Sequence, residues 1–61
     1  MKLNELISKM DCNERLLVRP SKVSEVNTSP ELLKLLDPEL LNREVENIWY
    51  SQLFNAIVIE L

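Results

Sequence analysis

The chain contains no glycine among its 61 residues, and this absence limits the turns that it can form. Glycine adopts positive φ angles without steric cost, and the tightest two-residue hairpins depend on it. We therefore expect the last two strands to be joined by a longer loop, Ser51 to Asn55, with Asn55 in the left-handed conformation. Phosphate-binding loops are excluded as well, because they are built on glycine.

A chain of this length forms one small domain, residues 1–61, which is marginally stable alone. Small domains usually gain stability from a disulfide, a metal or a partner subunit. Cys12 is the only cysteine and there is no histidine, so we expect neither an internal disulfide nor a metal site. We therefore expect a homo-oligomer without a cofactor.

The first half of the chain contains one helical pattern and one strand pattern. Apolar residues spaced along one helix face predict a helix from Lys2 to Met10. Leu16-Leu17-Val18 predicts a short strand over 15–19, which Pro20 should end because it lacks a backbone donor. The polar segment 21–28 is compatible with a helical turn or a ragged strand.

Two short helices are predicted in the leucine-rich middle. Thr28-Ser29-Pro30-Glu31 offers a hydroxyl cap, a proline in the first turn and a capping-box glutamate, and Asp37-Pro38-Glu39 repeats the pattern. The helix that begins at Pro30 should break at Asp37, because a residue before proline resists the α conformation. The segment 32–36 also matches the LxxLL docking pattern, but core packing is the favoured interpretation for leucines in so apolar a segment. The leucines expected to be covered are Leu32, Leu33, Leu35, Leu36, Leu40 and Leu41.

The segments 44–50 and 53–61 are rich in β-branched and aromatic residues and predict a C-terminal hairpin. Directly opposed residues of an antiparallel pair share a face, so a register with Trp49 opposite Ile57 gathers Val45, Trp49, Ile57, Ile59 and Leu61 on an apolar face. The one-residue slip would place acids in the core, which the cost of burying charge disfavours. The predicted fold is therefore α+β, a small antiparallel sheet of this hairpin and the strand near 15–19, with helices on one face.

The outer face of the predicted hairpin has an apolar centre edged by carboxylates. This composition is typical of a recognition surface, and a basic partner would relieve the repulsion expected between opposed Glu46 and Glu60. A few apolar residues on an outer strand face are also normal in proteins that bind nothing. The candidate partner-binding residues are Tyr50, Phe54, Ile48, Val58, Glu44, Glu46 and Glu60.

Charge and composition argue against several functional classes. A net charge of −3 and scattered basic residues argue against direct nucleic-acid binding. The apolar run 56–59 is too short for a membrane span, and the polar start does not predict a signal peptide. A lone thiol is typical of the cytoplasm. No pair of residues forms a recognisable catalytic arrangement, so we do not expect an enzyme.

The two ends of the chain resemble short proteins encoded by phages and prophages of Gram-positive bacteria. The resemblance rests on Met1-Lys2-Leu3-Asn4-Glu5-Leu6, on Glu44-Val45-Glu46-Asn47-Ile48, and on Ile57-Val58-Ile59-Glu60-Leu61. It covers about a third of the residues, and the middle of the chain departs from the pattern. It implies a phage origin, hence the host cytoplasm, and a role in binding a host protein. Inhibitors of CRISPR nucleases and of other defence enzymes are examples of such proteins.

Two functions are therefore expected from different classes. The first is a non-catalytic protein-binding module, a phage-encoded inhibitor or modulator of a host protein such as an anti-CRISPR protein. The alternative is a structural or self-assembling homodimer with no separate ligand. A DNA mimic is disfavoured, because three carboxylates in the last eighteen residues are few for imitating a phosphate run.

Overall fold

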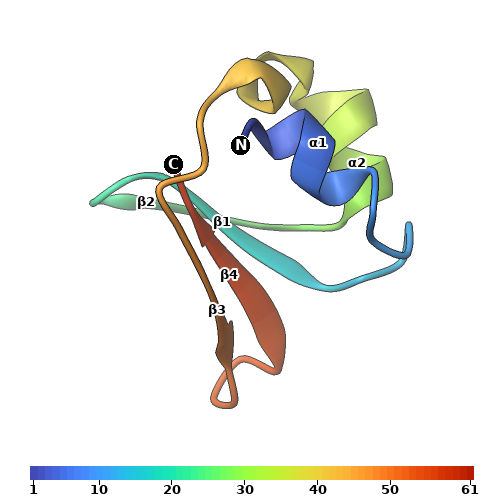
Figure 1. The fold of residues 1–61 in the computed structure, drawn as a ribbon. Coiled ribbons are helices and arrows are strands. Elements are labelled where there is room, and N and C mark those ends of the chain that lie inside the picture. Colours follow the sequence, from blue (N-terminus) through green and yellow to red (C-terminus); the bar gives the residue numbers. More distant parts are fainter.

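A computed structural model describes all residues, 1–61, as an α+β fold, which confirms the predicted class. The sheet has the strand order β2-β1-β4-β3, and the three helices lie on one of its faces (Figure 1). The elements in chain order are α1 (Leu3–Ile7), β1 (Leu16–Ser21), β2 (Ser24–Thr28), α2 (Pro30–Leu36), the 3₁₀ helix η1 (Pro38–Asn42), β3 (Asn47–Ser51) and β4 (Ala56–Glu60).

The sheet consists of two hairpins joined through its centre. β1 pairs with β2 and β3 pairs with β4 in antiparallel ladders, while the central strands β1 and β4 run parallel. The sheet is therefore mixed, whereas the sequence predicted antiparallel pairing throughout. The segment 21–28, for which the sequence allows a helical turn or a ragged strand, contains the last residue of β1, the turn and β2, and its polar residues suit an edge strand with a solvated face.

The prediction that Pro20 ends the first strand is wrong, because Pro20 lies inside β1. The pairing of β1 with β4 stops at Arg19, and the pairing with β2 is irregular between Val18 and Ser21. No neighbouring strand needs a backbone donor at Pro20, so the proline is tolerated there. The turn at residues 22–23 contains no residue with positive φ, and the hydroxyls of Ser21 and Ser24 meet across it at 2.7 Å.

The helices begin and end close to where the sequence signals place them. The predicted helix 2–10 is shorter, because α1 ends at Ile7 and tighter turns follow. Ser29 caps α2 by accepting a hydrogen bond from the backbone N–H of Leu32 at 3.3 Å, and Pro30 occupies the first turn. Leu32, and not Glu31, stands at the third helical position, so the predicted capping box does not form. The helix breaks at Asp37, as predicted, and η1 begins at Pro38.

The main hydrophobic core lies between the helices and the sheet. Its six fully buried side chains are Leu3, Ile7, Leu16, Val18, Leu33 and Ile59. Partly buried residues, including Val45, Ile57 and Leu61, pack against them. Fully burying one such aliphatic side chain contributes about 1.5–3 kcal/mol, so this cluster is the main source of stability in a domain of this size. The helices that contribute to it lie over the upper part of the sheet, and the loop between β3 and β4 lies beyond them (Figure 1).

A β-bulge precedes β3 and decides which side chains face the core. Glu46 donates its backbone N–H to the carbonyl of Glu60 at 2.8 Å, and Asn47 is the register partner of the same Glu60. Two residues thus oppose one, which shifts the alternation of side chains by one position. The bulge lies where the chain changes partners, because Val45 donates instead to the backbone carbonyl of Met1.

The predicted hairpin register is consequently wrong by one residue. Trp49 lies opposite Val58, not Ile57, and Tyr50 lies opposite Ile57. Trp49 is therefore on the face away from the helices, with 41% of its surface exposed, and is not a core residue. The predicted register required the side chains to alternate between the two faces without interruption from Val45 onward, and the bulge interrupts this alternation.

Candidate functional site: the hairpin arm

The hairpin of β3 and β4 projects beyond the helices as an arm (Figure 1). Ile48 and Tyr50 alternate with Trp49 and share a face with their register partners Ile59 and Ile57. This is the face that forms the core: Ile59 belongs to the core cluster and Ile57 packs against it. Ile48 and Tyr50 are exposed, as expected, but on the core-forming face and not on the predicted outer face; they stand on the edge strand β3, and Tyr50 is 55% exposed.

The loop at the tip of the arm adds two more exposed apolar side chains, Leu53 and Phe54. Asn55 has a φ angle of 51°, which confirms the predicted left-handed residue. The Tyr50 hydroxyl donates to the Asn55 side chain, and the Phe54 N–H donates to the hydroxyl of Ser51 at 3.3 Å. These bonds hold the loop in one shape. Ile48, Tyr50, Leu53 and Phe54 are named the hairpin surface below.

Val58 is not part of this surface. It was expected on the outer face among the partner-binding residues, but it is fully buried. It does lie on the face away from the helices, where Trp49 stands directly opposite it and covers it. The guanidinium carbon of Arg19 lies over the Trp49 ring, 5.7 Å from its centroid. On the face away from the helices, Val58 is thus buried by a large side chain of the sheet itself.

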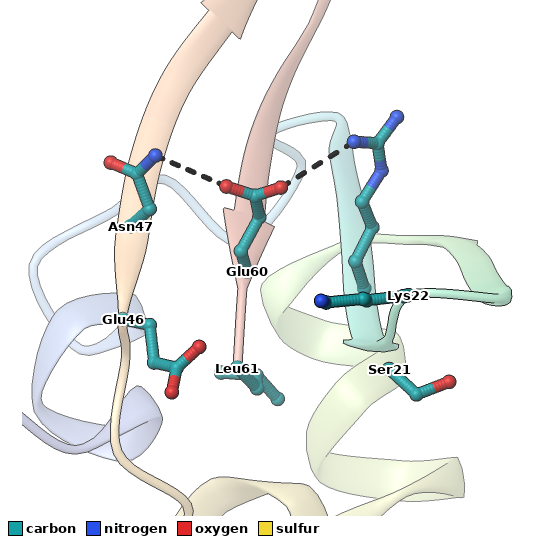
Figure 2. Close-up of a pocket in the computed structure, with 7 residues that line it drawn as sticks. Ser21, Lys22, Glu46, Asn47, Glu60 and Leu61 are labelled. Carbon is teal, nitrogen blue, oxygen red and sulfur yellow. Dashed lines mark hydrogen bonds and ion pairs between the residues drawn. The ribbon is translucent and has the colours of Figure 1, made fainter.

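The three carboxylates expected around Tyr50 lie toward the opposite end of the hairpin, where Glu46 and Glu60 line one cleft and Glu44 lies before β3. Glu60 accepts hydrogen bonds from Asn47 at 3.1 Å and from Arg19 at 3.5 Å (Figure 2). Glu44 forms an ion pair with the amino group of Met1 at 3.0 Å. Asn47, not Glu46, is the register partner of Glu60, so the expected repulsion between opposed acids is replaced by attractive contacts.

Glu46 lines an open cleft of about 360 Å³ at the end of the sheet, together with six other residues (Figure 2). Arg19 is bound to Glu25 at 2.8 Å and to Glu60, so its charge is already balanced by neighbouring acids. Lys22 and Glu46 are the two charged side chains of the cleft without an ion-pair partner. The cleft offers hydrogen bonds and charges of both signs, but it lies away from the hairpin surface.

A second exposed apolar surface lies on α2 and was missed by the sequence interpretation. Leu35 and Leu36 are each 70% exposed, Leu32 is partly exposed as well, and Leu33 alone is buried in the core. The expectation that all these leucines are covered is therefore wrong for three of them. The three exposed residues are those of the LxxLL pattern, at positions i, i+3 and i+4 on one side of the helix. Leu32, Leu35 and Leu36 are named the leucine surface below.

No protein-family model matches this chain, and neither a curated protein nor a solved structure matches it. None of the helices has the length and apolar character needed to cross a membrane. The geometry of the exposed surfaces is therefore the basis for assigning a function.

Proposed function

We propose that the protein is a non-catalytic binding module that contacts a partner protein through the hairpin surface. The observation that carries this proposal is the exposure of Ile48 and Tyr50 on the face of the sheet that elsewhere forms the core. Burying an apolar side chain is favourable by about 25 cal/mol per Å². A monomer gains nothing from leaving such residues uncovered, whereas a binding surface requires it.

Three further features support contact at this site. Tyrosine is enriched among the residues that dominate binding energy, since its ring gives a large contact area at little conformational cost. The loop is held by side-chain hydrogen bonds, so little order has to be gained on binding. The strand β3 itself contains no charged residue, so no ion has to be desolvated along it.

The partner proposed for this surface has an exposed apolar groove or patch. The carboxylates lie apart from Tyr50, so a partner that contacts the hairpin surface need not be basic. Binding of a basic partner stays a prediction for the cleft that contains Glu46. The narrower expectation, a phage inhibitor of a host defence protein acting in the host cytoplasm, is supported by the resemblance of the chain ends. This narrower role is proposed on the basis of that resemblance alone.

The test compares two surface variants for capture of a host protein. Tyr50→Ala removes the centre of the hairpin surface, and Leu35→Ala removes a side chain of similar exposure from the leucine surface. A protein captured by the tagged wild-type chain from a host lysate is purified, and its dissociation constant is measured for each variant. We expect Tyr50→Ala to weaken binding about 30-fold, as a central tyrosine does, and Leu35→Ala to change it less than about threefold.

Two outcomes would overturn the proposal. One is unchanged affinity for Tyr50→Ala, with the circular dichroism spectrum showing that the variant is folded. The other is loss of binding in Leu35→Ala, which would place the contact on the leucine surface.

The alternative function, a structural homodimer with no separate ligand, would bury the arm permanently. Sedimentation over a wide concentration range distinguishes the two. A chain that remains dimeric at every dilution and keeps Tyr50 buried cannot present it to a partner.

A further inference from the structure

The backbone of β3 is an unpaired edge, and its hydrogen-bonding groups have a fixed direction. Ile57 donates its N–H to the backbone just before β1, so the next residue of β4, Val58, faces β3. Val58 is the register partner of Trp49, which therefore faces β4. The alternate residues, Ile48 and Tyr50, direct their N–H and C=O groups away from the sheet, where no other element lies (Figure 1).

The two edges of the sheet differ in how they are protected. β2, the opposite edge, carries the charge of Glu25, is polar except for Val26, and pairs irregularly near its turn. Charges and irregular pairing discourage association at an edge. β3 has no charged residue and no proline, and its bulge lies at one end only. In the monomer, the N–H of Ile48 is satisfied by the side chain of Asn47 at 3.0 Å. No such contact is made by the N–H of Tyr50.

We infer that β3 pairs with β3 of a second copy of this chain, antiparallel about a two-fold axis at Trp49. Such an axis places Ile48 of one copy opposite Tyr50 of the other, so the outward-facing residues pair with each other on both sides of the axis. The two four-stranded sheets become one continuous sheet with both helix layers on the same face. This inference deepens the proposed function, because it names a second contact of the same arm, made by its edge.

The charge distribution selects this register over its neighbours. With the axis at Trp49, every residue paired along β3 is uncharged, and Glu46 falls opposite Gln52 of the second copy. An axis at Ile48 would place Glu46 beside Tyr50 of the second copy. An axis at Tyr50 would pair Ile48 with the loop residue Gln52. The apolar pairs Ile48–Tyr50 form only in the first arrangement, and each contributes cross-strand packing.

The size of the contact predicts a dimer that dissociates on dilution. A standard specific interface takes about 800 Å² from each partner. That is about a fifth of the 4226 Å² surface of this chain, more than a five-residue strand can supply. The faces of the arm also remain open, so two hairpin surfaces lie side by side in the dimer and form a larger surface for the partner. Raising the salt concentration should strengthen the dimer, because each copy carries a net charge of −3.

The test measures backbone hydrogen exchange of the wild-type protein at low and high concentration. We expect the exchange of the Tyr50 amide to slow at least about tenfold when the protein concentration is raised above the dissociation constant found by sedimentation. The amide of Asn27, which faces outward from β2, should exchange at the same rate throughout. Unchanged exchange at Tyr50, or slowing at Asn27 instead, would overturn the inference.

Matched proline variants give a second measurement. Ile48→Pro removes an outward N–H from β3, and Asn27→Pro removes one from β2, both without loss of a backbone hydrogen bond to a neighbouring strand. Ile48→Pro should weaken dimerisation at least about tenfold, because a donor is lost in each copy, and Asn27→Pro should not change it. Equal dimerisation of the two folded variants would contradict the proposed edge. A dimer that fails to form while Tyr50→Ala still weakens partner binding would refute this inference and leave the proposed function standing.

Discussion

The burial of Val58 gives the sharpest test of the hairpin register. The structure places this side chain on the face without helices and leaves it 0% exposed, whereas Val23 in the β1–β2 turn is 96% exposed. The same substitution, valine to alanine, can therefore be made at a buried and at an exposed position of one small domain. If the register were shifted by one residue, Val58 would lose the cover of Trp49.

The expected cost follows from the groups that are removed. Val58→Ala deletes two buried methyl groups, worth about 0.8 kcal/mol each in transfer free energy, and leaves a cavity under Trp49. We expect the free energy of unfolding to fall by about 2 kcal/mol, out of a total of about 3–9 kcal/mol for a domain of this length. Val23→Ala should stay within about 0.5 kcal/mol of the wild type.

The assay is urea unfolding followed by circular dichroism, at a concentration at which the wild type sediments as a monomer. A thermal scan should show the same difference, with a midpoint about 8–16 °C lower for Val58→Ala. If the two variants lie within about 0.5 kcal/mol of each other, Val58 is exposed in solution and the register described above is wrong.

Three other predictions follow from the same geometry. The fluorescence of Trp49, the only tryptophan, should be quenched by acrylamide in the folded protein, since a part of the ring is exposed; a fully protected signal would put the ring in a core. Asn55→Ala should lower the free energy of unfolding by about 1 kcal/mol and Asn55→Gly by less, because only the alanine resists positive φ; equal losses in thermal unfolding would argue against the left-handed loop. Ser29→Ala should cost about 1 kcal/mol in the same assay through loss of the cap of α2, and no change would mean that the cap is not formed.

Local signals predicted much of the fold. Ser29 and Pro30 mark the start of α2, Asp37 before a proline marks its end, and Asn55 supplies the positive φ that a chain without glycine needs. Each of these features depends on interactions within a few residues. The pattern of neighbouring residues is therefore sufficient to predict them.

The failures concern long-range pairing. Pro20 is tolerated in β1 because of where two other strands stop pairing, which no local pattern reveals. The bulge at Glu46 lies where the hydrogen-bond partner of the chain changes from the backbone of Met1 to that of β4. This change places Trp49 and Tyr50 on the faces opposite to those predicted. A one-residue shift moves every following side chain to the opposite face. The predicted partner-binding residues are therefore separated: Ile48, Tyr50 and Phe54 lie on the hairpin surface, Glu46 and Glu60 line the cleft, Glu44 pairs with Met1, and Val58 is buried.

The exposed leucines of α2 have a related explanation. The number of leucines in the segment predicted a covered helix, but a seven-residue helix lying on a small sheet can bury only one side. Leu33 occupies that side, and Leu35 and Leu36 remain outside. Their position makes the leucine surface the natural control for every experiment on the hairpin surface.

The most direct test of the binding role is nuclear magnetic resonance mapping of the labelled protein during titration with the captured partner. The expected result is that changes in chemical shift and line broadening concentrate at Ile48, Tyr50, Leu53 and Phe54. The amide signals of the leucine surface should keep their chemical shifts. Perturbation centred on Leu35 and Leu36, with the hairpin arm unaffected, would contradict the role assigned to the hairpin surface.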